Sequence, residues 1–442
     1  MVRIQFLAVF GFALACSATY GQIQHTEVPL GDTLAEALAN GSLTGDGARP
    51  FHIRVEVSEP ENPQSPYQGT FEEWWISADQ WRREVTSKDG MRQTIVVTGV
   101  KKTEKDEGDY FPVWLRNFVT ATFDPVPNAK AWKTAGIMIE QTTMPNGAKS
   151  DACARTKGSV GSAGRESTVY FNVCFDDRGR LKFVGSPGYS MEFHDYRSFG
   201  KKEIARKLID NPESGTTLVG NVTVLEDPLK ATSAGDAGDL FAPLPTNDDK
   251  FLSVQVSAET MQNLIAGNPP VVWPALRSGN VRGRVAIYVS ADTKGQVREA
   301  WPINADAGVD DSLREQAQKW TIKAAVDSAG KPVQVDGPIS FAYETRIENP
   351  LPQLNDAEIR QLATKIVDPV WPKSVHAGLV IEAGISVNEE GKVTGTGFHH
   401  TTAPPDAVMA VVDALRQWTF RPLIRDGKPE YFQGVVKFTV GQ

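Results

Sequence analysis

The C-terminal part of the chain carries one series of short motifs twice. The second copy follows the first after 96 to 98 residues. The repeated pairs are Trp273 and Trp371, Gly295 and Gly391, Trp320 and Trp418, Gly330 and Gly427, and Pro332 and Pro429. A repeat with a nearly constant period indicates two copies of one small domain in tandem. Because the repeated residues are aromatic, glycine or proline, we interpret them as packing and turn positions, not as catalytic groups.

Each copy is predicted to fold as β-β-α-β. Strict alternation of apolar residues predicts the strands, and apolar residues at a spacing of 3 and 4 predict the helix. The first copy has strands at 281–289, 297–303 and 339–343, with its helix starting at Asp310. The second has strands at 379–387 and 393–398, a helix at 405–417, and a last strand containing Phe438. Trp320 and Trp418 end the two helices, and we expect them to fill the space between helix and sheet.

This series resembles the C-terminal domain of TonB-type energy transducers, over about residues 265–345 and 365–442. Phe420 and Pro422 match the family's Trp-x-Phe-x-Pro segment, whereas the first copy has Ala324 at the proline position. The resemblance implies that an open sheet edge grips a partner peptide by strand addition, such as a segment of an outer-membrane receptor. The candidate partner-binding edge strand is the last one, with Val435, Val436 and Phe438.

The surroundings of the two copies depart from the TonB family. That family has an uncleaved membrane anchor and a long proline-rich spacer. Here a cleavable signal and a folded domain stand in their place. The resemblance therefore implies the binding mode more than coupling to an inner-membrane motor.

The first half is predicted to be rich in antiparallel strands. Alternating segments occur at 51–57, 69–76, 80–85, 92–100, 167–176, 181–184, 189–196 and 216–225. Residues 110–123 have helical spacing, and the charged run 104–107 is interpreted as a solvated loop. Segments 69–75, 80–84 and 196–207 resemble the family of periplasmic lipoprotein carriers and sensors with a half-open β-barrel. That resemblance implies one strongly curved sheet with helices on its concave side and a site for a hydrophobic ligand.

The chain is therefore predicted to be an α+β protein, with an N-terminal curved antiparallel β-sheet domain followed by two small β-β-α-β domains. The predicted parts are a signal peptide at 1–21, a half-barrel domain at 50–228, a linker at 229–250, and TonB C-terminal-like domains at 251–347 and 355–442.

The N-terminus and the cysteines indicate export to the periplasm or cell envelope. Arg3 precedes an apolar stretch at 4–16, which is too short for a comfortable membrane span and is typical of a signal peptide. Lipidation at Cys16 is the alternative processing route. In an oxidising compartment Cys153 and Cys174 are expected to form a disulfide, with two free buried thiols as the alternative. No later stretch of 18 apolar residues predicts a transmembrane span.

Composition and motifs argue against several function classes. The net charge of -8 disfavours a nucleic-acid binder, which needs a basic face. No nucleophile elbow, phosphate-binding loop or metal-ligand spacing occurs, so we expect no catalytic residue, cofactor or metal. The glycine-rich stretch 158–164 is interpreted as a flexible loop. Trp74 and Trp75 are expected on opposite faces of one strand, so at most one of them joins a concave pocket.

Two functional hypotheses remain. The first is an exported non-enzymatic envelope protein that binds protein or peptide partners by strand addition in a TonB-type transport context. The alternative is a periplasmic lipid or lipoprotein carrier or sensor that acts through the N-terminal half-barrel. An exported hydrolase is a distant third. The first requires an open edge strand, and the second requires an apolar concave cavity in residues 50–225.

Overall fold

A computed structural model describes residues 24–45, 47–127, 129–134, 136–143, 151–160, 167–210, 217–228, 240–245, 251–267, 269–304, 309–372, 375–398 and 403–441. The predicted signal peptide, Cys16 and most of the predicted linker lie outside these residues. The chain divides into two compact units. The first reaches Trp273 and also includes Gly283–Tyr343, and the second combines Pro274–Arg282 with Glu344–Gln442. The strands of the first repeat thus belong to the same unit as the N-terminal half.

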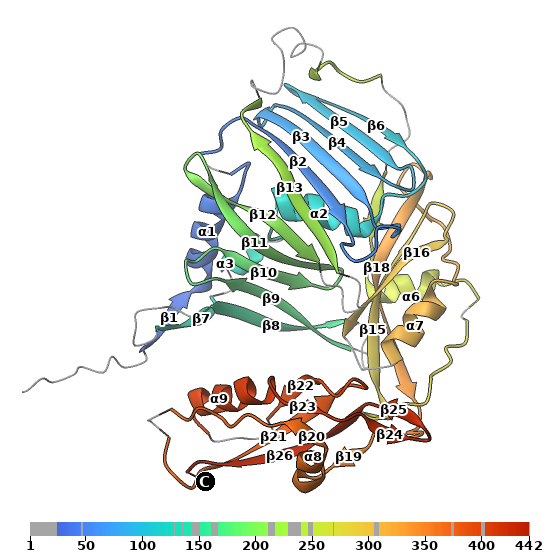
Figure 1. The fold of residues 1–442 in the computed structure, drawn as a ribbon. Helices are drawn as coiled ribbons and strands as arrows, with labels where there is room; N and C mark the ends of the chain where they lie inside the picture. The colour runs from blue at the N-terminus through green and yellow to red at the C-terminus, as the bar shows by residue number, and fades with distance from the viewer. Residues whose placement is uncertain are drawn as a thin grey trace, which may run out of the picture. The chain divides into compact units, whose positions relative to one another are not determined.

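One antiparallel sheet of 11 strands dominates the first unit, in the order β6-β5-β4-β3-β2-β13-β12-β11-β10-β9-β8. It curves strongly around the helix α2 (Figure 1). Its strands are β2 (Phe51–Ser58), β3 (Gly69–Ser77), β4 (Gln80–Ser87), β5 (Arg92–Thr98), β6 (Lys101–Glu107), β8 (Ala152–Val160), β9 (Ser167–Phe175), β10 (Leu181–Ser186), β11 (Tyr189–Phe199), β12 (Lys202–Asp210) and β13 (Leu218–Glu226). The predicted curved antiparallel sheet with helices on its concave side is confirmed, and we call it the curved sheet.

Helix α2 (Val113–Phe123) lies against the concave face because its apolar side chains match the inward residues of the strands. Leu115 and Phe118 are fully buried in one core with Phe51 and Val55 of β2. Gly220 of β13 allows the close approach, since a Cβ there would lie 2.7 Å from the Phe118 ring. Helices α1 (Leu30–Gly41) and α3 (Ala129–Thr134) and the two-stranded sheet of β1 (Gln24–Pro29) and β7 (Met138–Thr143) complete this half.

Two segments of the curved sheet differ from the sequence-based expectation. The charged run 104–107 lies in strand β6, at one edge of the sheet, and not in a loop. An edge strand with one solvated side tolerates charges that a central strand does not. Strand β8 at the other edge includes Gly158 to residue 160 of the expected flexible loop, whereas residues 161–164 lie outside the described residues. The opposite placement of two tryptophans is confirmed, because Trp75 stacks on Phe51 and Trp74 on His52.

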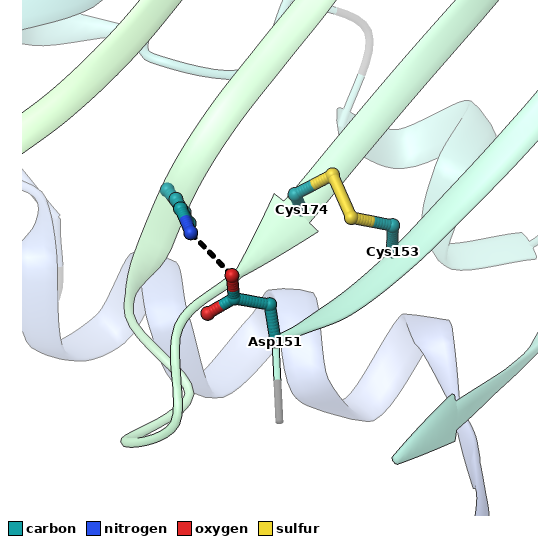
Figure 2. Close-up of a disulfide and its surroundings, with 4 residues drawn as sticks. Asp151, Cys153 and Cys174 are labelled. Atoms are coloured by element: carbon teal, nitrogen blue, oxygen red, sulfur yellow. Dashed lines mark hydrogen bonds and ion pairs between the residues drawn. A yellow bond between two sulfur atoms is a disulfide. The ribbon is translucent and has the colours of Figure 1, made fainter. Parts of the chain in front are cut away.

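The predicted disulfide is present at this second edge. Cys153 of β8 and Cys174 of β9 lie directly opposite each other, with their Cα atoms 4.1 Å apart. Figure 2 shows the bond between the two strands, with the Asp151 carboxylate paired to the Lys182 side chain of β10 nearby. The bridge therefore fixes the outermost strand of the curved sheet to its neighbour.

Replacing both Cys153 and Cys174 with serine is expected to destabilise the first unit by about 3 kcal/mol. The bridge joins residues 21 apart, and closing a loop of that size restricts the unfolded chain by roughly this amount. Thermal unfolding with and without a reductant measures the effect. The reductant should lower the melting temperature of the natural protein and leave that of the double variant unchanged. An equal response of both proteins would contradict the prediction.

The first repeat forms a mixed sheet with the order β14-β18-β15-β16. Its elements are β14 (Ser253–Gln255), α6 (Ala258–Leu264), β15 (Arg282–Ala291), β16 (Val297–Asn304), α7 (Val309–Ala317), β17 (Ala325–Val326) and β18 (Pro332–Glu344). The expected β-β-α-β elements are all present. A short strand and helix, β14 and α6, precede them and were not predicted. We call this the first C-terminal sheet.

The second unit contains an analogous sheet with the order β19-β26-β21-β22. Its elements are β19 (Gln353–Leu354), α8 (Asp356–Leu362), β20 (Ala363–Lys365), β21 (Val380–Val387), β22 (Val393–Gly397), α9 (Pro405–Leu415), β23 (Thr419–Phe420), β24 (Leu423–Arg425), β25 (Lys428–Glu430) and β26 (Phe432–Thr439). As in the first sheet, a short strand lies parallel to the last long strand. We call this the second C-terminal sheet.

The expected edge position of Val435, Val436 and Phe438 is wrong. Their strand β26 lies between β21 and β19. Beyond β19, two side chains of α8 occupy the outer backbone groups of Lys437: Asp356 accepts from its N–H at 3.0 Å, and Arg360 donates to its carbonyl at 2.8 Å. The preceding helix and strand, which the repeat motifs do not include, close this edge.

Gly391 provides a test of the turn chemistry that the two repeats share. It has a φ of 78°, and a Cβ there would lie 2.0 Å from the Phe420 carbonyl oxygen. We expect Gly391→Ala to destabilise the second unit by about 3 kcal/mol, through backbone strain together with this collision. Gly427→Ala is the matched control, because Gly427 has a φ of 77° but open space around it. The control should cost about 1 kcal/mol in denaturant unfolding. Equal losses would contradict the packing argument.

Candidate ligand-binding site

The first unit has an apolar groove with a volume of about 690 Å³. Its walls come from three places: α3 and the residues beside it, strands β8 to β10 of the curved sheet, and the first C-terminal sheet. The lining residues include Pro127, Trp132, Ile137, Phe171, Val184, Pro187, Val256, Tyr288 and Pro338. The volume lies within the range of about 300 to 1,000 Å³ that is typical of small-molecule sites. No charged side chain is among the residues that line it.

The turn between β10 and β11 forms one wall of this groove. Gly188 in the turn has a φ of 79°, and a Cβ there would lie 2.5 Å from the ring of Tyr288 in β15. The Asn117 side chain of α2 donates a hydrogen bond to the Gly188 carbonyl at 3.0 Å. The turn is therefore held between the helix inside the curved sheet and the first C-terminal sheet, and the wall of the groove is preformed.

Glu299 of β16 joins the same two parts of the first unit. The N-terminus of α2 follows Pro112 and has no capping side chain of its own. The Glu299 carboxylate takes this role from a distant strand. It accepts hydrogen bonds from the Val113 and Trp114 N–H groups at 2.6 and 3.3 Å, the Tyr110 hydroxyl at 2.7 Å and the Trp301 indole at 3.1 Å. Burial raises the pKa of Glu299, and the hydrogen bonds from Tyr110, Val113 and Trp114 together with the nearby Arg116 oppose that rise.

Two further buried polar residues of β18 strengthen this junction. Asp336 accepts a hydrogen bond from the Tyr288 hydroxyl at 2.6 Å and forms an ion pair with Arg116 of α2 at 3.0 Å. The side-chain amide of Gln334 accepts from the Phe111 N–H at 3.1 Å and donates to the Phe111 carbonyl at 3.0 Å. The first C-terminal sheet is thus bound to α2, inside the curved sheet, and to Phe111 before it by directional contacts. These contacts fix the shape of the groove.

Two other cavities lie in the first unit. One, of about 340 Å³, is lined by α1, the end of α2 and strands β11 and β12, with Arg180, Tyr196 and Glu203 among its residues. The other, of about 190 Å³, lies beyond the β10–β11 turn and shares Gly185, Ser186 and Pro187 with the apolar groove. We call the smaller one the Asp210 pocket, after the acidic residue in its lining.

The residues selected from the sequence lie elsewhere, in the cores and turns of the two C-terminal sheets. Trp320 and Trp418 are buried, Trp273 lies 5.8 Å from Tyr343 between ring centres, and Trp371 packs on the core of the second unit. Phe420 is buried, Pro422 is exposed, Pro332 begins β18, and Pro429 lies in β25. Gly295, Gly330 and Gly427 have positive φ values, as Gly391 does. None of these residues lines the apolar groove.

The groove and the buried acids beside it were not predicted from the sequence. Trp132 and Ile137 lie in a short helix and the segment that follows it, neither of which has a clear periodicity. Glu299 and Asp336 are acidic residues in strands, without a motif around them. The sequence offers no local signal for them, because both strands contain other polar residues, such as Arg298 in β16 and Gln334 in β18.

The described parts of the chain contain no group of three or more His, Cys, Asp or Glu side chains placed to hold a metal ion. They also contain no helix that is long and apolar enough to cross a membrane.

Comparisons with solved structures return two chains that are each similar to about half of this chain. An outer membrane lipoprotein-sorting protein domain from Vibrio parahaemolyticus is 10% identical, with 48% of this chain and 97% of that chain covered and a TM-score of 0.21. A LolA superfamily protein from Nitrosomonas europaea is 9% identical, with 45% and 93% covered and a TM-score of 0.21. No protein-family model and no curated protein sequence matches the chain. The resemblance of the two C-terminal sheets to TonB C-terminal domains rests on the repeated motifs.

Proposed function

We propose that this protein is an exported, non-enzymatic carrier or sensor of an acyl-bearing ligand, either a lipid or the acylated end of a lipoprotein. The observation that carries the proposal is the apolar groove of about 690 Å³, whose lining residues include no charged side chain. An acyl chain gains free energy in such a groove by leaving water, at about 25 cal/mol for each Å² of apolar surface that becomes buried. The lipoprotein-sorting role named for the Vibrio structure is of the same class.

The shape of the groove supports binding more than catalysis. The first C-terminal sheet, which forms one wall, is held on α2 and the residue Phe111 before it by Glu299, Gln334 and Asp336. The site is therefore preformed and loses little entropy when a ligand binds. The disulfide between Cys153 and Cys174 suits the oxidising compartment in which an exported carrier works.

Titration with a fluorescent fatty-acid analogue tests the proposal. The natural protein should bind the probe saturably, and Trp132→Ala should weaken binding at least fivefold, because the half-buried Trp132 lines the groove. Trp74→Ala is the matched control, since Trp74 is also half-buried but is not among the residues that line the groove. Absence of saturable binding, or equal weakening by both substitutions, would exclude the groove as the site.

Peptide binding by strand addition is a second candidate function. Strand β22 ends the second C-terminal sheet, and within the described residues it pairs only with β21. Its free side is a template for an added strand, such as a segment of an outer-membrane receptor. The edge assigned from the sequence, β26, is closed by β19 and α8, so we assign strand addition in this sheet to β22.

Site-directed crosslinking in cells distinguishes the two edges. A photoreactive residue at Thr396 of β22 should crosslink to an outer-membrane receptor, whereas one at Val435 of β26 should not. Both positions lie on strands of the same sheet, so each serves as the other's control. A crosslink from Val435 alone, or from neither position, would reject strand addition at β22.

A further inference from the structure

Asp210 is a buried acid whose carboxyl has no protein partner in the described residues. It ends strand β12, retains 5% of its exposure, and lines the Asp210 pocket. No described residue donates a hydrogen bond to this carboxyl or forms an ion pair with it. Burying a carboxylate without a compensating donor or cation is costly. The position of Asp210 at the wall of a cavity indicates that the compensating group comes from a ligand.

The other walls of the pocket are suited to an organic cation. Aromatic rings of Trp114, Tyr189 and Trp301 line it, and Trp114 and Tyr189 are themselves buried. Aromatic faces carry partial negative charge and attract ammonium groups, more strongly where water is excluded. A volume of about 190 Å³ is below the range for a complete drug-sized ligand and suits a single head group.

The outer part of the pocket carries the opposite charge. The guanidinium of Arg155 lies 3.6 Å from the centre of the Tyr170 ring, and both side chains are exposed. An acid inside and a guanidinium at the rim favour a ligand that carries an ammonium group and an anionic group. A simple cation would gain from Asp210 but would be repelled by Arg155.

We infer that the Asp210 pocket binds the ammonium group of a zwitterionic ligand, with its anionic group toward Arg155. The pocket shares the residues of the β10–β11 turn with the apolar groove. One amphiphile can therefore place its head group in the pocket and its acyl chain in the groove. This extended form rests on the proposed function, whereas recognition of the ammonium group does not.

Titration with phosphocholine, followed by tryptophan fluorescence and calorimetry, tests the inference. The full exported chain should bind phosphocholine more tightly than choline, and Asp210→Asn should weaken phosphocholine binding at least tenfold. Asp177→Asn is the matched control, since Asp177 lies exposed in the β9–β10 turn. The Asp210→Asn variant should unfold cooperatively in urea as the natural protein does, which shows that the variant is folded whether or not the groove binds the fatty-acid analogue.

The possible outcomes separate the two proposals. The ammonium site is rejected if the Asp210→Asn variant binds phosphocholine as tightly as the natural protein. It is also rejected if 3,3-dimethylbutanol, the uncharged analogue of choline, binds as well as choline does. Either result rejects the ammonium site even if the fatty-acid analogue still binds. If phosphocholine binds and the fatty-acid analogue does not, the ammonium site stands and the acyl groove fails. A lysophosphatidylcholine that binds at least tenfold more tightly than phosphocholine identifies a lipid source. Equal affinity identifies a free small ligand.

Discussion

Replacing Glu299 with alanine is expected to destabilise the first unit by about 4 kcal/mol. The carboxylate accepts hydrogen bonds from Tyr110, the first N–H groups of α2, and Trp301. Removing it leaves these donors in a buried site, and each buried donor without an acceptor costs about 1 to 3 kcal/mol. The loss of the negative charge at the N-terminus of α2 adds to the effect.

Calorimetric unfolding measures this effect, because the two compact units can give separate transitions. Glu299→Gln should cause an intermediate loss of stability, because the glutamine amide keeps one acceptor oxygen but turns its NH2 group toward other donors. Glu315→Ala is the control, because Glu315 is an exposed acid on α7 in the same unit and should change stability by less than about 0.5 kcal/mol. A loss of less than 1 kcal/mol for Glu299→Ala would show that capping of α2 by Glu299 does not stabilise the first unit.

Replacing Asp210 with asparagine is expected to change how the stability of the first unit depends on pH. Burial raises the pKa of Asp210 to about 8, with a smaller contribution from the negative charge of Glu299. An unfolded aspartate has a pKa of about 3.9, so between these values the folded state binds more protons than the unfolded state. The unfolding free energy therefore falls as pH rises. From pH 5 to pH 8 the loss from this one group is about 4 kcal/mol.

The asparagine variant lacks this titration, so its stability relative to the natural protein should increase by about 4 kcal/mol from pH 5 to pH 8. Urea unfolding at several pH values measures the difference. Asp106, whose pKa burial raises to about 6, titrates in both proteins and cancels in the comparison. Asp177→Asn should follow the natural protein at every pH. Parallel curves for the Asp210→Asn variant and the natural protein would mean that Asp210 stays ionised and has a partner.

The sequence predicted most of the curved sheet and of the two C-terminal sheets because their signals are local. Strand β2 alternates strictly, and α2 has apolar residues at helical spacing around Phe118. The disulfide was predicted because two cysteines lie outside the signal segment and the expected compartment is oxidising. Gly391 is recognisable in the same way, because a turn that needs positive φ selects glycine whatever lies around it.

The errors share one cause, which is that an edge is a property of the whole sheet. The charges of 104–107 indicate a loop in isolation, but they also suit a strand that has only one neighbour. The last strand, with Val435, looked like an edge because the repeat motifs do not include β19 and α8. A strand becomes central only when another segment of the chain pairs beside it.

The candidate site depends on tertiary structure for the same reason. Asp210 and Glu299 are ordinary acids in the sequence. Only the packing of distant strands makes Glu299 a helix cap and leaves the Asp210 carboxyl without a partner among the described residues. By itself, the sequence determined strands, helices, turns and the disulfide, since these follow from periodicity, backbone conformation and side-chain chemistry within short segments. Only the tertiary structure decided which edges are open, which acids are buried and where an apolar groove forms. Each of these depends on which surfaces the folded chain removes from water.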